Sequence, residues 1–473
     1  MKKVGGLRNR KSERGQTIAL VAVAITALLA MAALAIDVVS LYVARAETQR
    51  AADAAALAGA KMFVNSGVTS LSGGGPVTLG DVCASGGAGS PQAANREAEA
   101  VAQQNLIAGQ APTVQTITCT LGEQRNPEIT VTVQSANLPG FFSRIWNRPG
   151  NIVRATATAE AYNSSGFNAP VQAQAVKPWL LPNCYSGPGS WGTATCASAP
   201  KFINSDGTIN SGSSFLGQTI ELTQINCGAG GTPGANGCGV VPNTGFFYSL
   251  QIPENSGPPV CPSPDANWSG CDFSPDGHDY SENIACANPQ TIACGQTIGG
   301  GGPTSVWADG TASTNTRATR HATRCLIHAD ADDLDQGQDQ FCGGGFGGCN
   351  KPTTLPVTIR GDYNNPDNTM ANGRNISRSD SVVTVPLYDG NAALCTTTGN
   401  CAAAAPTIVG FLQLGITCSV DAPGGEQGCA DKTGHSNPEV EAVILNAVGC
   451  APGAPGTPVT GTGTSPVAVR LIH

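Results

Sequence analysis

The clearest pattern in the sequence is a helix-forming run from Arg14 to Ala60, apolar in its first half and amphipathic and alanine-rich in its second. From Thr17 to Ile36 it contains no charged residue, no Gly and no Pro. About 20 helical residues, each rising 1.5 Å, match the roughly 30 Å hydrocarbon core of a bilayer. We therefore predict a transmembrane helix at 17–36 that continues unbroken beyond the membrane.

The residues before this run predict its orientation. One acid, Glu13, stands among six basic residues: Lys2, Lys3, Arg8, Arg10, Lys11 and Arg14. Such a bias holds the N-terminus in the cytoplasm, so we expect residues 1–16 to form a cytoplasmic arm and all later residues to be exported. The alternative is a cleaved secretory signal, but its apolar core would be only about 7–15 residues long and would end at a small-residue cleavage site. Here the longer run passes directly into Asp37.

Beyond the apolar run, two rows of residues recur at helical spacing. One row is polar and the other is small: Arg45, Gln49 and Asp53, and Ala52, Ala56 and Ala60. A small-residue row permits close packing, and an amphipathic helix leaving the bilayer must cover its apolar side. We predict that the alanine row packs against strands of the same module.

Those strands are predicted from period-2 alternation. Apolar and polar residues alternate at 114–120, 129–133 and 155–159, as in strands with one buried face. A second helix should precede them, with Ser90 as N-cap, Pro91 at the first helical position and Gly109 at its end. The long helix, the second helix and three antiparallel strands would form a pilin-like module over residues 37–165.

The remainder, residues 166–473, has the pattern of a β-rich region. A linker is expected at 163–178, and no helical periodicity of any length is evident before 440–448. Short apolar runs bounded by Gly, Pro or Asn predict strands at 246–252, 355–359, 382–387, 408–416, 440–445 and 467–472. The expected fold class is therefore α+β: one N-terminal transmembrane helix, a pilin-like α/β module, and a β-rich, disulfide-containing exported region.

Cysteine positions support export independently. All 18 lie beyond Lys61, where disulfides would persist. Zinc is the competing explanation, but there is no CxxC pair and only five His. Short loop spacing suggests seven local pairs, one pair tying the first module's loop to its first strand, and one long-range pair: Cys184 with Cys196, Cys227 with Cys238, Cys261 with Cys271, Cys286 with Cys294, Cys342 with Cys349, Cys395 with Cys401, Cys418 with Cys429, Cys83 with Cys119, and Cys325 with Cys450.

Composition and charge narrow the function classes. The 60 Gly, 32 Pro and 5% aromatic residues are typical of a loop-rich exported β protein more than of a helical enzyme. Of 25 Lys and Arg and 33 Asp and Glu, six bases and one acid precede the apolar run, which leaves a net charge of −13 beyond it. This charge disfavours nucleic-acid binding.

The helical run resembles the N-terminal module of the TadE/TadG-like family of Flp (tight-adherence) pilus-assembly proteins. The residues that carry the resemblance are Gly15, Gln16, Asp37, Leu41, Tyr42, Arg45, Gln49 and the alanine-rich block 51–60, which includes Asp53, Ala56 and Gly59. The resemblance covers about a tenth of the chain. Minor pilins of this system carry a Glu five residues after a processing glycine, whereas Leu20 occupies that position here, a departure that argues against processing by a prepilin peptidase.

This resemblance implies a structural role in pilus assembly or surface adhesion, at the bacterial inner membrane, with the lipid bilayer and Flp/Tad assembly proteins as partners. A tethered adhesin or binding module unrelated to a pilus is the alternative, followed by a tethered hydrolase. Many TadG relatives carry a von Willebrand A domain with a DxSxS metal run, and that run is absent here.

Candidate chemistry elsewhere is sparse, so we expect no enzyme activity, cofactor or metal. The acidic segment from Asp330 to Asp339 has oxygen ligands for Ca²⁺ but not the EF-hand spacing, and a solvated loop is the other interpretation. His278 beside Asp279, and His321 with His328, are the histidine arrangements that could serve a hydrolase. No GxSxG, HExxH or Walker motif accompanies them.

Overall fold

The structure, a computed structural model, has an apolar N-terminal helix followed by a β-rich region with disulfide bonds. The residues it describes are 11–70, 77–122, 126–138, 150–165, 171–187, 190–192, 194–210, 214–225, 238–253, 278–299, 307–309, 315–329, 337–344, 347–349, 352, 354–361, 373–395, 405–419, 439–451, 459–460 and 465–472.

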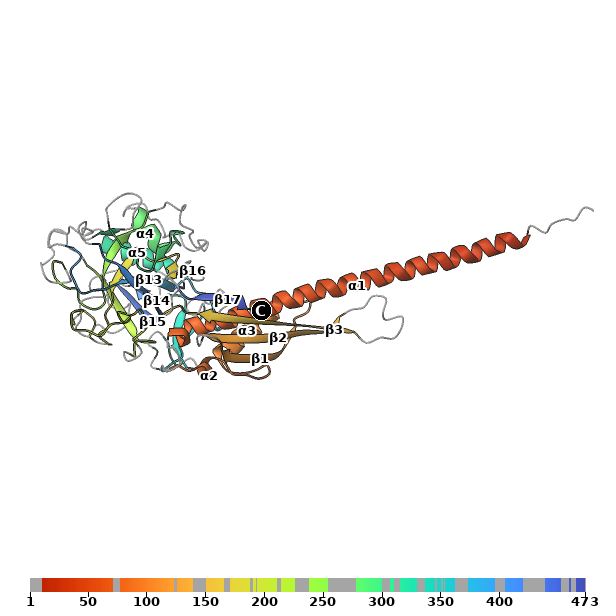
Figure 1. Ribbon diagram of the computed structural model, residues 1–473, viewed down its shortest axis with the longest axis horizontal. Coiled ribbons are helices and arrows are strands. Elements are labelled where there is room, and N and C mark those ends of the chain that lie inside the picture. The colour runs from red at the N-terminus through yellow and green to blue at the C-terminus, as the bar shows by residue number, and fades with distance from the viewer. Residues whose placement is uncertain are drawn as a thin grey trace, which may run out of the picture.

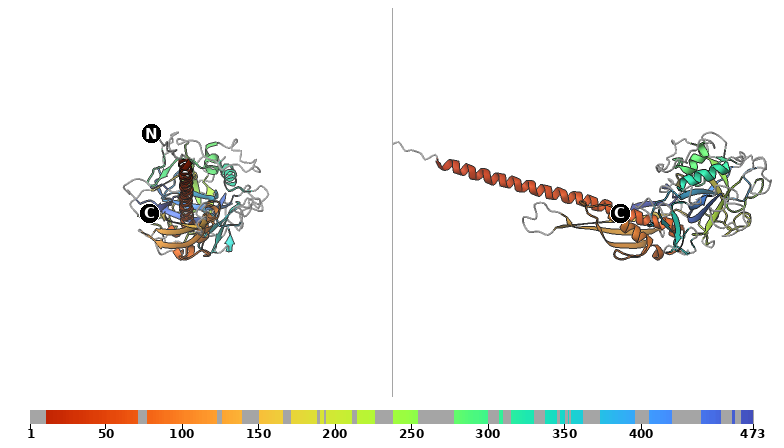
Figure 2. Two further views of the ribbon diagram at one scale, coloured as in Figure 1. Left: turned by 90° about the vertical axis from the view of Figure 1, so that its right-hand side faces the viewer. Right: turned by 180° about the vertical axis from the view of Figure 1, so that it is seen from behind.

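Helix α1, Lys11–Asn65, contains the whole predicted helical run. Its described part from Thr17 is long and apolar enough to cross a membrane. The first half projects away from the rest of the protein, with Leu20 73% and Leu34 65% exposed (Figure 1). The folded body lies at the other end of the helix (Figure 2). The chain leaves the helix through Gly67, whose φ of 77° is the left-handed conformation that glycine adopts readily at a helix end.

The first sheet confirms the three predicted strands: β1, Thr113–Leu121; β2, Pro127–Leu138; and β3, Asn151–Tyr162. They pair antiparallel in the order β1-β2-β3. Apolar and polar residues alternate along these strands and point to opposite faces of the sheet. Ile129 is fully buried on one face. On the other face, the hydroxyls of Thr130 and Thr158 share a hydrogen bond of 2.9 Å.

The second helix is confirmed but its ends differ from the prediction. Helix α3 spans Ala93–Gln104, with Gln92 rather than Ser90 as N-cap. The Ser90 hydroxyl donates to the Gln92 side chain and does not cap the helix. At the other end, the Asn105 amide donates to the carbonyl of Val101 at 2.7 Å. The helix therefore stops before Gly109. A four-residue helix, α2, Leu79–Val82, and a short 3-10 turn, η1, Val68–Ser70, lie between α1 and α3.

The first sheet is completed by the C-terminal end of the chain. Strand β17, Ala468–Ile472, pairs antiparallel with β3, placing Leu471 opposite Ala159 (Figure 1). The run at 467–472 is thus a strand, as predicted, but it belongs to the sheet of the first module. The division at 165/166 assigned it to the second region, because strand periodicity carries no information about pairing partners.

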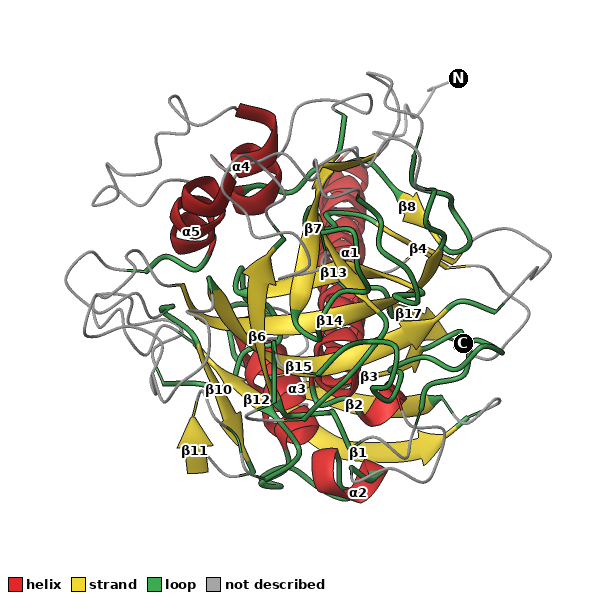
Figure 3. Cartoon of the chain, turned by 90° about the vertical axis from the view of Figure 1, so that its left-hand side faces the viewer, coloured by secondary structure: helices red, strands yellow, loops and turns green. Residues whose placement is uncertain are grey.

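The second region is built on a seven-stranded sheet (Figure 3). In sheet order its strands are β5, Trp179–Pro182; β13, Val382–Tyr388; β14, Ile408–Ser419; β15, Val440–Gly449; β6, Thr219–Gln224; β7, Phe246–Gln251; and β9, Trp307–Asp309. The predicted runs at 246–252, 382–387, 408–416 and 440–445 correspond to β7, β13, β14 and β15. Both faces of β13 and β15 are buried, which explains their nearly continuous apolar sequences.

Two helices in this region contradict the expectation of an all-β pattern before residue 440: α4, His278–Ala285, and α5, Asn315–Leu326. In α5, Ala318, Ala322 and Cys325 are buried at i, i+4 and i+7. The buried residues are small and stand among Thr and Arg, so their helical period is easy to miss in the sequence. The helix is stabilised by packing this small apolar side against the sheet.

Two small sheets complete the architecture. One contains β4, Val171–Ala173, β8, Ile292–Ala293, and β16, Val459–Thr460, and the other contains β10, Gln340–Gly343, β11, Gly347–Cys349, and β12, Thr358–Arg360. The run predicted at 355–359 gives only the short strand β12. The linker expected at 163–178 is wrong in part, because it contains β4. It also contains Asn163, which is buried and donates to the carbonyls of Thr69 at 3.0 Å and Ala447 at 3.1 Å.

Candidate functional site: the outer half of the long helix

The residues singled out just after the apolar run lie beside the start of strand β3. Asp37 is 9% exposed, whereas Tyr42 and Arg45 are exposed. Tyr42 and Arg45 line a cavity of about 520 Å³ together with Ile152 and Arg154 of β3. The structure therefore places the two exposed motif residues beside the first residues of β3, with two cationic and several apolar side chains around the cavity.

Gln49 connects the helix to the sheet. Its Nε2 donates to Asp53 Oδ1 at 2.7 Å, one turn further along α1, and to the carbonyl of Thr156 on β3 at 3.4 Å. The polar row predicted from i, i+4 spacing thus contains a direct side-chain hydrogen bond, and Asp53 orients the amide that reaches β3.

The small-residue row lies inside the module. Ala52, Ala56 and Ala60 are fully buried, where α1 packs on β2, β3 and α3. A Cβ added at Gly59 would lie 2.6 Å from Ile129 Cδ1 and 3.3 Å from the carbonyl oxygen of Ala94. Small side chains on this side let the helix approach both the sheet and α3 closely.

Glu47 makes a contact outside its own helix that the sequence did not predict. Its Oε2 accepts a hydrogen bond from the backbone N–H of Ala108 at 2.8 Å. Ala108 has a φ of 49° and lies in the turn that joins Ile107 to Gln110. Helical spacing within α1 cannot predict this partner, because only the folded position of the 107–110 turn brings Ala108 to Glu47.

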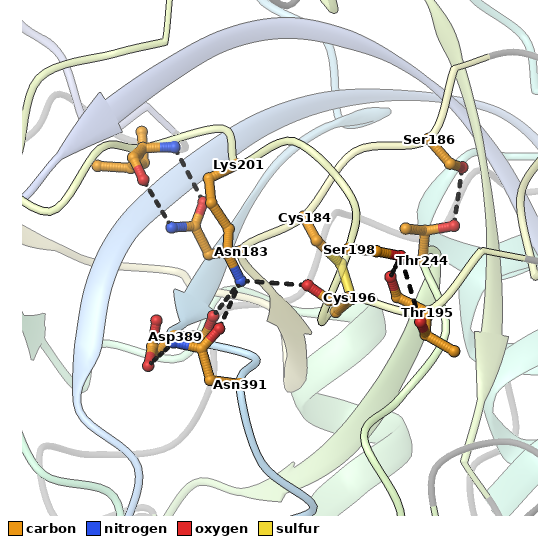
Figure 4. The surroundings of a disulfide bond; sticks show 11 residues. Asn183, Cys184, Ser186, Thr195, Cys196, Ser198, Lys201, Thr244, Asp389 and Asn391 are labelled. Carbon is orange, nitrogen blue, oxygen red and sulfur yellow. Dashed lines mark hydrogen bonds between the residues drawn. A yellow bond between two sulfur atoms is a disulfide. The ribbon is translucent and has the colours of Figure 1, made fainter.

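Three predicted disulfides are present: Cys83–Cys119, Cys184–Cys196 and Cys342–Cys349. Around Cys184–Cys196, Lys201 joins distant parts of the chain (Figure 4). Its Nζ donates to the carbonyl of Cys196 at 3.4 Å and to Asn391 Oδ1 at 2.8 Å. The disulfide loop is therefore held against the segment that follows β13.

Two predicted pairs are wrong. Cys294 bonds to Cys450, 156 residues away, which excludes Cys286 with Cys294 and Cys325 with Cys450. The cause is strand β8, which brings Cys294 to the end of β15, a contact that loop length does not predict. Cys238, Cys286, Cys325, Cys395 and Cys418 are also disulfide-bonded. The remaining predicted pairs each involve a residue outside the described ranges: Cys227, Cys261 with Cys271, Cys401 and Cys429.

The candidate metal residues lie mostly outside the part of the chain that the structure describes. Asp330, Asp332, Asp333 and Asp335 lie outside the described residues, and the described Asp339 carboxylate accepts from the Ser379 hydroxyl. Among residues that the structure describes, no cluster of three or more His, Cys, Asp or Glu side chains could hold a metal ion.

The histidines lie on or near the two helices of the second region. His278 and Asp279 begin α4, with side chains outside the described set, and His321 lies on α5. His328 Nε2 lies 3.2 Å from Asp380 Oδ2. This pair joins the end of α5 to the segment before β13.

The sequence also did not predict the buried carboxyl of Glu439, which directly precedes β15. Glu439 is 3% exposed, its Oε2 has no hydrogen-bond partner among described residues, and burial raises the pKa of its carboxyl to about 8. Arg320 of α5 opposes this shift electrostatically, and the backbone N–H of Gln224 donates to the carboxyl. Glu439 directly precedes the apolar run 440–445, and nothing in that local pattern indicates that its carboxyl is buried.

Comparison of the whole chain with curated proteins and with solved structures gave no significant match. Comparison with protein-family models gave a match. The matched segment begins at Gly15 and Gln16, which lie within α1 but whose side chains are outside the described set, and it ends inside the packed part of the helix. Residues 15–62 match the family described as "Putative Flp pilus-assembly TadE/G-like".

Proposed function

We propose that this chain is a structural, membrane-anchored protein of Flp/Tad-type pilus assembly. The observation that carries the proposal is the family match at residues 15–62, which coincides with a helix that is exposed and apolar in one half and packed in the other. In the proposed arrangement the apolar half anchors the protein, and the motif residues of the outer half hold the helix to its sheet.

The proposed topology has residues 1–16 in the cytoplasm, a single span at 17–36, and an exported body. That body comprises a pilin-like module, residues 37–165 joined by strand β17, and the β-rich region up to β16. The basic arm supports the orientation. The disulfides Cys83–Cys119 and Cys294–Cys450, both beyond the helix, support export into an oxidising compartment.

We also propose that the role is not enzymatic. Two of the motif side chains have structural contacts: Gln49 donates a hydrogen bond to the carbonyl of Thr156 on β3, and Ala56 is fully buried in the packed part of the helix. A surface adhesin that uses the same anchor, but works apart from any pilus, is the competing function.

Protease protection tests the topology. Protease added to spheroplasts should digest all but a small N-terminal fragment, and a protected C-terminus would reject the proposed orientation. Deletion of the gene should abolish Flp pili, and affinity-tagged protein should co-purify with pilus-assembly proteins. Normal pili in the deletion strain together with lost surface attachment would favour the adhesin.

A further inference from the structure

Two adjoining cavities lie between the outer half of α1, helix α3 and the segment 373–382, which precedes and enters β13. The first has a volume of about 650 Å³ and the second about 860 Å³. They share Val101, Ser377 and Arg378 as lining residues. The two cavities therefore lie next to each other along the 373–382 segment, and we name them together the basic groove.

Four cationic side chains line the basic groove: Lys61 of α1, Arg96 of α3, and Arg374 and Arg378 of the segment. Within the described residues none of the four has an ion-pair partner within 4 Å. Burial and the positive charge of Arg378 lower the pKa of Lys61 to about 8. The groove thus concentrates uncompensated positive charge on a chain whose overall net charge is −8.

Two acidic residues face the same groove, and both are already engaged. Glu97 is 6% exposed and is hydrogen-bonded to Ser377, and burial raises the pKa of its carboxyl. Asp380 lies 3.2 Å from His328. Neither acid forms an ion pair with the four cations in the described structure, so the charge of the groove stays positive.

Asn65 adds an unpaired hydrogen-bond acceptor. The residue is 1% exposed, lines the first cavity, and donates through Nδ2 to the carbonyl of Ser377 at 3.1 Å. Its Oδ1 has no partner among the described residues. A buried acceptor without a partner costs free energy, which a ligand N–H or O–H would recover.

We propose that the basic groove binds an extended acidic polypeptide segment of a partner protein. Ligand carboxylates pair with Lys61 and Arg378 near Asn65 and with Arg96 and Arg374 further along, while a ligand backbone N–H donates to Asn65 Oδ1. The apolar wall of Leu57, Val101, Val382 and Val469 accommodates the uncharged side chains. Cations distributed over two adjoining cavities fit a chain with repeated carboxylates better than a single small anion.

Fluorescence anisotropy with the purified full-length protein in nanodiscs tests this proposal. The probe is a fluorescein-labelled peptide of about ten residues with alternating Asp and Val, and the matched control peptide has Asn in place of every Asp. We expect saturable binding of the Asp peptide that weakens with added salt, and binding of the Asn peptide that is at least about tenfold weaker.

Charge reversals locate the site. Arg378→Glu and Arg374→Glu should each weaken Asp-peptide binding by about tenfold, whereas Arg50→Glu, a reversal on the exposed side of α1 outside the groove, should leave it unchanged. Lys61→Met removes the positive charge but keeps the aliphatic part of the side chain. This variant replaces the charge reversals if they fail to fold, and it should also weaken Asp-peptide binding. Melting temperatures of all variants distinguish lost binding from lost structure.

Three results would overturn the proposal: equal binding of the Asp and Asn peptides, equal weakening by Arg50→Glu and Arg378→Glu, or binding of oligogalacturonate with no binding of the Asp peptide. The last would assign the groove to an acidic polysaccharide. Because the assay contains no pilus component, its result is independent of the proposed role in pilus assembly.

Discussion

Asn446 Nδ2 donates to Thr69 Oγ1 at 2.7 Å, although the two residues are 377 positions apart in the chain. The same amide group donates to the carbonyl of Val64, in the last turn of α1, at 2.9 Å. Asn446 is fully buried in β15, at the centre of the seven-stranded sheet. One side chain therefore closes the C-terminal end of the long helix and fixes the first module against the second region.

Replacement of this amide should loosen the junction. Asn446→Ala leaves the Val64 carbonyl and Thr69 hydroxyl without that donor in a dry environment, and we expect a loss of about 2 kcal/mol in unfolding free energy. Hydrogen exchange should accelerate for residues 62–70 before it changes in β2. The matched control is Gln110→Ala, which removes a side-chain amide at an exposed site, and equal exchange in both variants would contradict the role of Asn446.

Ala56 tests the packing of α1. Ala56→Arg inserts a long charged side chain into a fully buried position, and we expect a destabilisation of about 3 kcal/mol with normal membrane insertion. Ala46→Arg, on an exposed side of the same helix, should have little effect. Protease sensitivity of the exported body reports the difference. Equal resistance of the two variants would show that the row does not hold the module together.

The Cys294–Cys450 disulfide should contribute more stability than any short one. The chain-entropy estimate gives about 5 kcal/mol for its separation of 156 residues, against about 2 kcal/mol for the separation of 7 between Cys342 and Cys349. Thermal melts of the double variants Cys294→Ser/Cys450→Ser and Cys342→Ser/Cys349→Ser measure this. Similar melting temperatures for the two would contradict the expected order.

Glu439 makes stability depend on pH. Its pKa is about 8 in the folded protein against 4.5 for the ordinary carboxyl. Below pH 4.5 the group is protonated in both states. Between pH 4.5 and 8 only the unfolded chain loses the proton, so unfolding becomes easier as pH rises, and above pH 8 this contribution is constant.

Glu439→Gln, which resembles the protonated acid, should therefore be more stable than the parent by a few kcal/mol at pH 8 and nearly equal to it at pH 4. Denaturant unfolding across this range provides the measurement. Glu128→Gln, at a partly exposed position on β2, is the control. A pH-independent difference for Glu439→Gln would exclude titration of Glu439 as the cause.

Local sequence patterns determined the elements of the first module. The apolar first half of α1, the buried alanine row and the alternation in β1, β2 and β3 each depend on residues within one helix or one strand, where backbone geometry alone relates spacing to a face. The disulfides Cys184–Cys196 and Cys342–Cys349 were predictable for a related reason, since few residues separate each pair and their ends meet readily.

Only the tertiary structure decided which distant surfaces meet. The pairing of β17 with β3, the Cys294–Cys450 bond and the convergence of Lys61 with Arg378 join residues that share no local period. An apolar strand or a cationic side chain is compatible with many partners. The choice among them depends on the packing of the whole chain, because burial rewards any well-fitting apolar neighbour, whatever its position in the sequence.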